Sequence, residues 1–205
     1  MMKWAALLVV LFGCGPRATT PPDPSQMRYP GEFASVSELE GRGDFLTRQA
    51  LVGRYGEREF HGEVVVQKVG GAITLIGVTP FGAKAFVVQQ DASGVKGQEI
   101  FKGTLPFPPE FMLLDVHRSL FIKLAEGTGD GTRRGERAGE AISEEWAGGR
   151  LLRRTYRRLD RRPKGTITVE YVGGMTGEQP PRVMRLDNGW FGYSVEITTV
   201  SWQAL

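Results

Sequence analysis

Short runs of alternating apolar and polar residues recur from residue 44 onward and restrict the chain to antiparallel strands. Val64 and Val66, for example, share one face of a run whose other face is polar, which is the pattern of a half-buried strand. The Gly70-Gly71 pair that follows predicts a tight hairpin into the next apolar run. Strands joined by such short turns form an antiparallel meander.

The same criteria place strands along the rest of this region, with a single helical interruption. Apolar residues at helical spacing predict a helix over Glu110–Leu124, with Pro109 at its first turn. The glycine-rich and charged segment Gly127–Gly139 is expected to be a flexible surface loop. The expected strands are Phe45–Val52, Phe60–Val69, Ala72–Val78, Ala83–Gln90, Val95–Phe101, Glu144–Trp146, Arg150–Leu159, Gly165–Val172, Arg182–Leu186 and Tyr193–Ser201.

The fold class is therefore mainly β (α+β), with a single curved antiparallel sheet. A long sheet that curves strongly tends to roll up, and its concave face has to be filled. The helix in the middle of the chain is the candidate to plug or cover that face.

The first fourteen residues have the layout of a secretory signal. Lys3 precedes an apolar run that ends at Gly13 and is too short to cross a bilayer, since a spanning helix needs roughly 20 apolar residues. Cys14, the only cysteine, follows, and Leu11–Cys14 resembles the bacterial lipobox, in which the cysteine is acylated. An ordinary signal peptide with an incidental cysteine is the alternative.

This resemblance implies three regions. Residues 1–13 form a lipoprotein signal peptide, residues 14–43 a lipidated cysteine with a proline-rich tether, and residues 44–205 the folded domain. Acylated Cys14 would hold the chain to membrane lipid. Gly15 follows it in place of the aspartate that retains enterobacterial lipoproteins in the inner membrane, which points to the bacterial outer membrane, facing the periplasm.

Composition gives no support for nucleic acid as a partner, because a formal net charge of +3 is small for a chain of 205 residues. The residues also suggest no catalytic centre, metal site or cofactor. His61 is expected to be solvated and His117 to be a satisfied, partly buried helix residue. Asp115 and the pair Glu144-Glu145 are taken as surface or capping carboxylates.

Basic residues crowd one strand and the turn after it, from Arg150 to Lys164. Because neighbouring strand residues point to opposite faces, the charge falls on both sides, which suits an edge strand or an exposed hairpin. We expect a solvated edge, and contact with anionic lipid headgroups is the alternative.

Several short motifs, taken in order, resemble the LolA/LolB superfamily, and most closely LolB-like outer-membrane lipoproteins. After the lipobox come Gly77–Gly82 with its Thr-Pro-Phe-Gly turn, Leu113–Asp115 on the helix, and Gly192–Ile197 in the last strand. The resemblance covers most of the chain from Asp44. It implies an incomplete β-barrel with a helical lid over an apolar cavity that accepts the acyl chains of lipoproteins.

The resemblance also implies site residues. Pro80, Phe81 and Gly82 match the loop that carries an exposed apolar residue in LolB and delivers cargo to the membrane; Phe81 packed into the core is the alternative. The apolar cavity would be lined by the inward-facing residues Val64, Val66, Ile73, Leu75, Phe86, Val88, Phe111, Leu114, Ile167, Val169, Val195 and Ile197.

Three hypotheses follow for function. The first is a non-enzymatic lipoprotein that binds an acyl chain, a similar hydrophobic ligand or lipoprotein cargo. The second is a structural adaptor of the same fold that binds an envelope protein. The third, a hydrolase, has the least support. A sizeable apolar cavity under the helix favours the first hypothesis, and a solid core with an exposed apolar patch favours the second. A polar cleft with converging Asp, Glu or His would favour the third.

Overall fold

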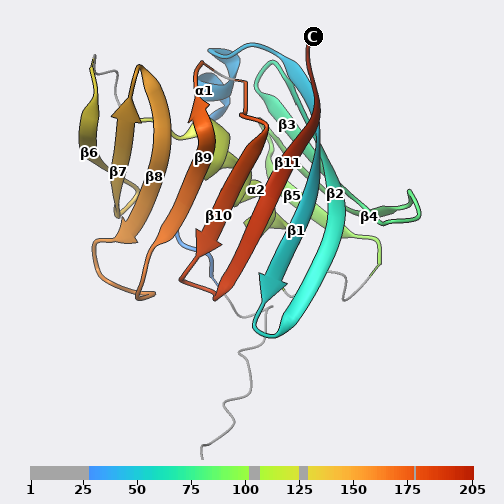
Figure 1. Ribbon diagram of the computed structural model, residues 1–205. Helices are drawn as coiled ribbons and strands as arrows, with labels where there is room; N and C mark the ends of the chain where they lie inside the picture. Colours follow the sequence, from blue (N-terminus) through green and yellow to red (C-terminus); the bar gives the residue numbers. More distant parts are fainter. Residues whose placement is uncertain (1–27, 102–106, 125–128, 178) are drawn as a thin grey trace, which may run out of the picture.

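The computed structural model describes residues 28–101, 107–124, 129–177 and 179–205. Its described strands form one open sheet in the order β5-β4-β3-β2-β1-β11-β10-β9-β8-β7-β6, with every neighbouring pair antiparallel (Figure 1). The strands are β1 (Phe45–Tyr55), β2 (Arg58–Val69), β3 (Ala72–Val78), β4 (Lys84–Asp91), β5 (Gly94–Glu99), β6 (Gly131–Arg137), β7 (Glu140–Ala147), β8 (Arg150–Arg158), β9 (Ile167–Met175), β10 (Val183–Asn188) and β11 (Tyr193–Ala204).

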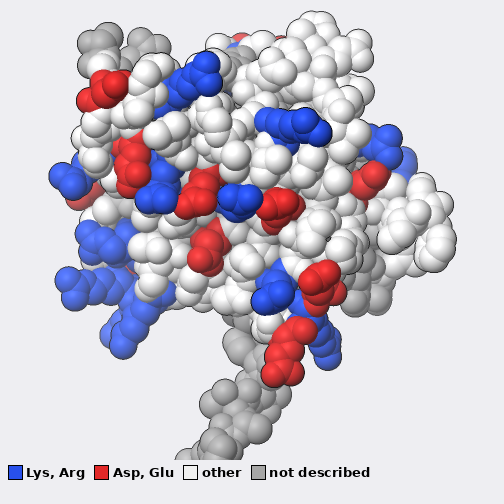
Figure 2. Space-filling model, in the orientation of Figure 1, with Lys and Arg blue, Asp and Glu red and all other residues white. Residues whose placement is uncertain are grey.

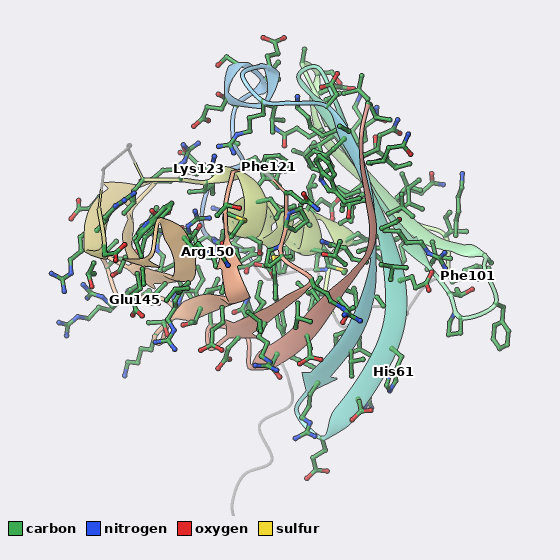
Figure 3. All side chains as sticks on the ribbon, turned by 45° about the horizontal axis from the view of Figure 1, so that its top comes forward. His61, Phe101, Phe121, Lys123, Glu145 and Arg150 are labelled. Atoms are coloured by element: carbon green, nitrogen blue, oxygen red, sulfur yellow. The ribbon has the colours of Figure 1, made fainter. Side chains whose placement is uncertain are left out.

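The expected single curved antiparallel sheet with a helix on its concave face is confirmed. The first and last strands pair along their full lengths in the middle of the sheet, with Phe45 opposite Ala204 and Tyr55 opposite Tyr193. The two arms of the sheet curve away from this pair, and helix α2 (Pro109–Val116) lies in the space between them (Figures 1 and 3). The sheet is thus an incomplete barrel with a helical plug.

The helical segment is shorter than expected. α2 continues without a break into a π-helical turn, η2 (His117–Phe121), and the turn ends where the Ile122 N–H donates to the His117 carbonyl at 2.8 Å. Ile122 itself is extended, so the helix does not reach Leu124. The apolar spacing predicted too long a helix, because Ile122 is buried like a helix residue although its backbone is extended.

The prediction of a loop over residues 127–139 was wrong for Gly131–Arg137. These residues form β6, an edge strand whose register with β7 runs from Gly131 opposite Trp146 to Arg137 opposite Glu140. An edge strand pairs on one side only and its side chains are largely exposed, so it needs no apolar alternation. Glycine and charge concealed the strand.

The arginine-rich strand is not an edge. β8 lies between β7 and β9, and its inward-facing Arg154 is completely buried. On the outer face, Arg153 donates to Glu170 of β9 at 2.8 Å and lies 3.5 Å from Glu145 of β7. Figure 2 shows basic and acidic side chains interspersed over this face of the sheet. Arg153 on the outer face and Arg154 on the inner face of β8 therefore each have a carboxylate partner on a neighbouring strand.

The packed part of the chain begins before residue 44, within the segment expected to be tether. Helix α1 (Val36–Glu40) starts with a capping box between Ser35 and Glu38. Ala34 and Leu39 are buried in the core. Residues 14–27 of the expected tether, and Cys14 with them, lie outside the described residues.

Candidate functional site

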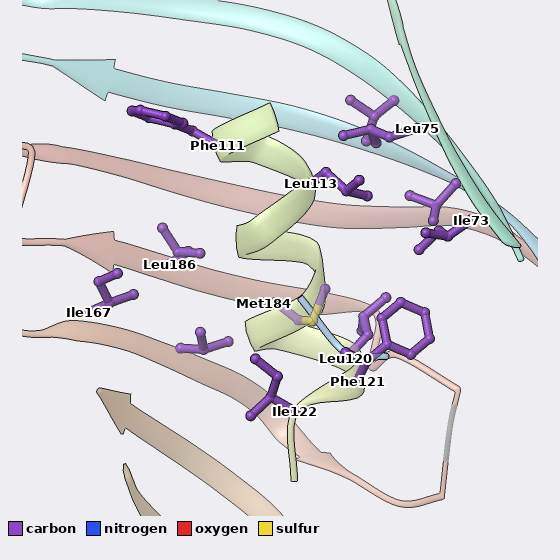
Figure 4. Close-up of a cluster of buried hydrophobic side chains, with 14 of the residues drawn as sticks. Ile73, Leu75, Phe111, Leu113, Leu120, Phe121, Ile122, Ile167, Met184 and Leu186 are labelled. Atoms are coloured by element: carbon purple, nitrogen blue, oxygen red, sulfur yellow. The ribbon is translucent and has the colours of Figure 1, made fainter. Parts of the chain in front are cut away.

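An apolar cavity of about 60 Å³ lies between the helical segment and the concave face of the sheet. The helix crosses the strands here, with Leu113 directed toward Leu75 and Leu120 beside Met184 (Figure 4). Strand residues lining the cavity are Gln49, Leu51, Phe60, Val64, Leu75, Met184, Leu186, Tyr193, Val195 and Ile197, and residues of the central segment are Phe107, Met112, Asp115, Val116, Ser119 and Leu120.

Four of the twelve residues expected to line a cavity do so, and they come from β2, β3 and β11. They are Val64, Leu75, Val195 and Ile197. The other eight are buried in the core outside the cavity wall: Val66, Ile73, Phe86, Val88, Phe111, Leu114, Ile167 and Val169.

Phe86 illustrates why burial and cavity lining differ. It stands opposite Gly77 on the neighbouring strand, and a Cβ on Gly77 would lie only 2.0 Å from the ring. The ring therefore covers the glycine. Among the lining residues that sequence reasoning missed, Gln49 and Leu51 follow the same inward alternation of β1 as Phe45, but the polar character of Gln49 hid its position.

The size of the cavity limits what it can hold. A cavity needs about 10–15 Å³ of space open to a water-sized sphere to hold one water, so about 60 Å³ accommodates a few waters and not an acyl chain. Binding a longer ligand requires part of the helical segment to move away from the sheet.

The two ends of the helical segment are attached differently. At the carboxyl end, the Arg118 carbonyl accepts from Arg154 Nη1 and the Tyr156 hydroxyl, both at 2.7 Å, and the Ser119 carbonyl accepts from the Tyr171 hydroxyl at 2.7 Å. Every residue in this cluster is buried. These bonds tie the π-helical turn to β8 and β9.

The Arg154 side chain also forms a buried ion pair. Its Nε donates to Glu144 Oε1 at 2.8 Å, and the second carboxylate oxygen of Glu144 accepts from Trp146 Nε1 at 3.1 Å. Glu144 and Asp115, which were expected to be surface or capping groups, are both buried. Arg154 lies on the neighbouring strand, and the tyrosines that bind Asp115 are distant in the sequence, so the spacing of residues did not reveal these contacts.

Asp115 connects α2 to the N-terminal segment and to β11. It accepts hydrogen bonds from the hydroxyls of Tyr29 and Tyr193 and lies 3.4 Å from Arg118, which pairs with Glu140 at 2.8 Å. Burial raises the pKa of the Asp115 carboxyl, and the Arg118 charge and the two hydroxyls oppose that rise. The polar anchors of the segment thus begin at Asp115.

Before Asp115, the segment is held by apolar contacts. The centroid of the Phe111 ring lies 4.9 Å from that of the Tyr29 ring and 5.6 Å from that of the Phe191 ring. Met112 is half-buried and lines the cavity. Pro108 at the N-cap has no side-chain capping bond. Apolar contacts are non-directional, so this end can shift at a lower cost than the polar end.

The β3–β4 turn carries Phe81, whose side chain is 96% exposed. Gly82 adopts φ of +80°, and the Thr79 N–H donates to the Ala83 carbonyl at 2.8 Å, which closes the turn. Ile100 and Phe101 are also exposed after β5, and Figure 3 shows Phe101 at the outer end of this arm. Phe81 therefore does not pack into the core.

His61 is solvated as expected, whereas His117 is more deeply buried than expected and its Nε2 has no hydrogen-bond partner among the described residues. His61 is exposed on the outer side of β2 (Figure 3). His117 is fully buried, and its Nδ1 accepts from the Ala34 N–H at 3.0 Å. Burial, the largest cause, lowers the pKa of His117 to about 3, with a further contribution from Arg137.

Within the described residues, no group of three or more His, Cys, Asp or Glu side chains is arranged to hold a metal ion. No helix among them is long and apolar enough to cross a membrane.

A family model described as "Protein of unknown function (DUF3261)" matches residues 47–201, which include every residue that lines the cavity. The chain belongs to the DUF3261 family. A comparison with curated proteins gives no match.

Three of the solved structures similar to this DUF3261 chain each share 11% sequence identity with it. A domain from Vibrio parahaemolyticus named for outer membrane lipoprotein sorting gives a TM-score of 0.44, covering 83% of this chain and 92% of that one. A LolA superfamily protein from Nitrosomonas europaea gives a TM-score of 0.44, and the match covers 84% of this chain and 94% of that one. A DUF1329 family protein from Desulfovibrio piger gives a TM-score of 0.43, and the match covers 82% of this chain and 88% of that one.

Proposed function

We propose that this protein is a non-enzymatic lipoprotein, anchored through acylated Cys14 to the outer membrane and facing the periplasm, that binds an acyl chain or a similar hydrophobic ligand. Transfer of lipid or lipoprotein cargo to that membrane is the process it would serve. The observation that carries the proposal is the apolar cavity between the concave face of the sheet and a helical segment with one polar and one apolar attachment.

In this proposal the apolar end of α2 lifts when the ligand enters. Phe111 and Met112 would move away from the sheet, while the buried bonds to the Arg118 and Ser119 carbonyls hold the π-helical turn in place. The space that opens is walled by residues that already line the cavity, such as Val64 and Leu75. The ligand would replace apolar contacts of the helix with apolar contacts of its own, at roughly 0.8 kcal/mol per buried methylene.

Neighbouring valines of β2 test this proposal. Val64 faces the cavity and Val65 faces the opposite side of the sheet. We expect Val64→Phe to weaken binding of dansylated undecanoic acid by about tenfold or more, because overpacking such a site costs about 1–3 kcal/mol. Val65→Phe should leave it unchanged. The binding is measured by fluorescence titration of the chain carrying Cys14→Ser, which has no acyl group of its own.

Equal affinity in the two valine variants would contradict binding under the helix. No measurable binding to either variant or to the parent chain would favour the second hypothesis, a structural adaptor for an envelope protein. The small volume of the cavity is the observation that keeps this hypothesis in view.

We further propose that the turn formed by Pro80, Phe81 and Gly82 touches the membrane. A phenylalanine that moves from water into the bilayer gains about 1.5–3 kcal/mol. Phe81→Ser in the Cys14→Ser chain should therefore reduce co-sedimentation with phosphatidylethanolamine–phosphatidylglycerol vesicles by about tenfold. Val200→Ser, at an exposed apolar position on β11, is the control. An equal loss in both variants would contradict a role for the turn.

A further inference from the structure

Gln49 brings a buried amide nitrogen without a hydrogen-bond partner to the apolar cavity. Its side chain is 3% exposed and lines the cavity from β1, yet its Nε2 has no hydrogen-bond partner among the described residues. A buried donor left unpaired costs about 1–3 kcal/mol, and such groups in native proteins call for an explanation.

The other buried amide side chains have partners for their nitrogens. Gln90 Nε2 donates to the Ala34 carbonyl at 2.7 Å, and Asn188 Nδ2 donates to the Tyr29 hydroxyl at 2.6 Å. Thr47, the inward-facing residue before Gln49 on β1, donates its hydroxyl to the Ser201 carbonyl at 2.8 Å. Other buried nitrogens without a hydrogen-bond partner, such as Arg118 Nε, Arg137 Nε and Trp202 Nε1, belong to residues outside the cavity wall. Among the described residues that line the cavity, the unpaired buried nitrogen is that of Gln49.

The backbone at Gln49 is irregular as well. On β11, Ser201 lies opposite Arg48 but Thr199 lies opposite Gln49, so Val200 is an extra residue and the pair contains a bulge. Bulges re-aim side chains and bend the strand, and they occur often beside functional sites. This bulge sits where Gln49 turns into the cavity.

Polar neighbours in the cavity wall are already engaged. The Asp115 carboxylate accepts from Tyr29 and Tyr193, and the Ser119 carbonyl accepts from Tyr171. These groups fasten the helix, whereas the Gln49 nitrogen does not. A ligand that enters along the apolar wall would therefore meet a free donor at Gln49.

We infer that Gln49 donates a hydrogen bond to a carbonyl oxygen of the ligand, which makes the ligand an acyl ester or acyl amide and not a bare hydrocarbon. This inference rests on the proposed function and names the chemistry of the ligand for the same site. An unpaired donor at this point of an apolar wall favours one depth of the chain, with the ligand carbonyl beside Gln49.

The test compares three probes of similar length in competition with dansylated undecanoic acid on the Cys14→Ser chain. Methyl decanoate represents the ester of a membrane lipid, N-methyl decanamide represents the N-acyl group of a lipoprotein, and dodecane lacks a carbonyl. Gln49→Met keeps the length of the side chain and removes its donor. We expect it to weaken binding of the ester and the amide by about fivefold to tenfold, with dodecane unchanged or tighter.

Gln90→Met is the matched control, because Gln90 is a buried glutamine outside the cavity wall. It should leave the affinity of each carbonyl probe relative to dodecane unchanged. Of the ester and the amide, the probe that binds the parent chain more tightly identifies the source of the carbonyl.

The outcomes separate the inference from the proposed function. If all three probes bind and Gln49→Met changes them equally, the inference is overturned, the donor belongs to a bound water, and the hydrophobic site remains. If no probe binds the parent chain, both the proposed function and the inference fail. Should Gln49→Met not fold, the Gln49 side-chain amide resonances of the parent chain decide, since the ester should shift them and dodecane should not.

Discussion

Glu144→Leu is expected to lower the free energy of unfolding by about 3–5 kcal/mol, because it leaves the Arg154 charge buried without its partner. The guanidinium and the carboxylate are both almost completely shielded from water. The substitution also removes the acceptor of the Trp146 indole N–H. Urea unfolding followed by tryptophan fluorescence measures the change.

Glu145→Leu is the matched control. Glu145 is the next residue of β7, but it faces solvent and pairs with Arg153 at 3.5 Å, so its loss should cost no more than about 1 kcal/mol. In the double variant Glu144→Leu/Arg154→Met the buried charge is gone, and part of the stability should return. Equal losses in the two single variants would show that the buried pair does not anchor the sheet to the helical segment.

The pH dependence of stability should contain a distinct contribution from His117. In the folded protein the pKa of His117 is about 3, whereas the ordinary value is 6.5. Below pH 6.5 the unfolded chain takes up a proton that the folded chain does not, so stability falls as the pH falls. This stabilisation is complete above pH 6.5 and is lost at about 1.4 kcal/mol for each unit of pH below it, down to the folded-state pKa of about 3.

His117→Gln isolates this contribution. A glutamine carbonyl can accept the Ala34 N–H in place of Nδ1, and it does not titrate. The difference in unfolding free energy between the parent chain and the variant should therefore shrink or reverse by about 2–3 kcal/mol between pH 6.5 and about 4.5. Other groups near the ring, such as Arg137 and Glu38, are common to both proteins. Parallel stability curves for the two proteins would contradict a neutral buried histidine.

How far the sequence predicts this fold depends on where the determinants of each element lie. Alternation within β2 and β3 is local, so the faces of Val64, Val66 and Leu75 could be assigned. The edge strand β6 was not predicted because it is paired on one side and has little apolar surface. The end of the helix was not predicted because Ile122 continues the apolar pattern of the helix while its backbone is extended.

The buried polar cluster could not be predicted for a different reason. Arg154 and Glu144 are partners across two strands, and Asp115 meets Tyr29 and Tyr193 from distant parts of the chain. Charged residues in isolation are expected on the surface, and only the tertiary arrangement shows that each has a buried partner.

The cavity shows the same limit. Burial of its apolar residues follows from alternation, but the small difference between a filled core and a cavity depends on how rings such as Phe86 cover glycines on neighbouring strands. Gln49 was missed because the pattern assigns polar residues to solvent. Its burial beside a bulge between β1 and β11 depends on the pairing of the two ends of the domain.

Native mass spectrometry of the Cys14→Ser chain, purified from cells and accompanied by lipid extraction, tests the central claim most directly. The account predicts a fraction of the protein with a co-purifying acyl lipid, and uptake of added fatty acid or lipopeptide by the remainder. A uniform ligand-free mass that stays unchanged after these additions would contradict it, and the adaptor hypothesis would then describe the protein better.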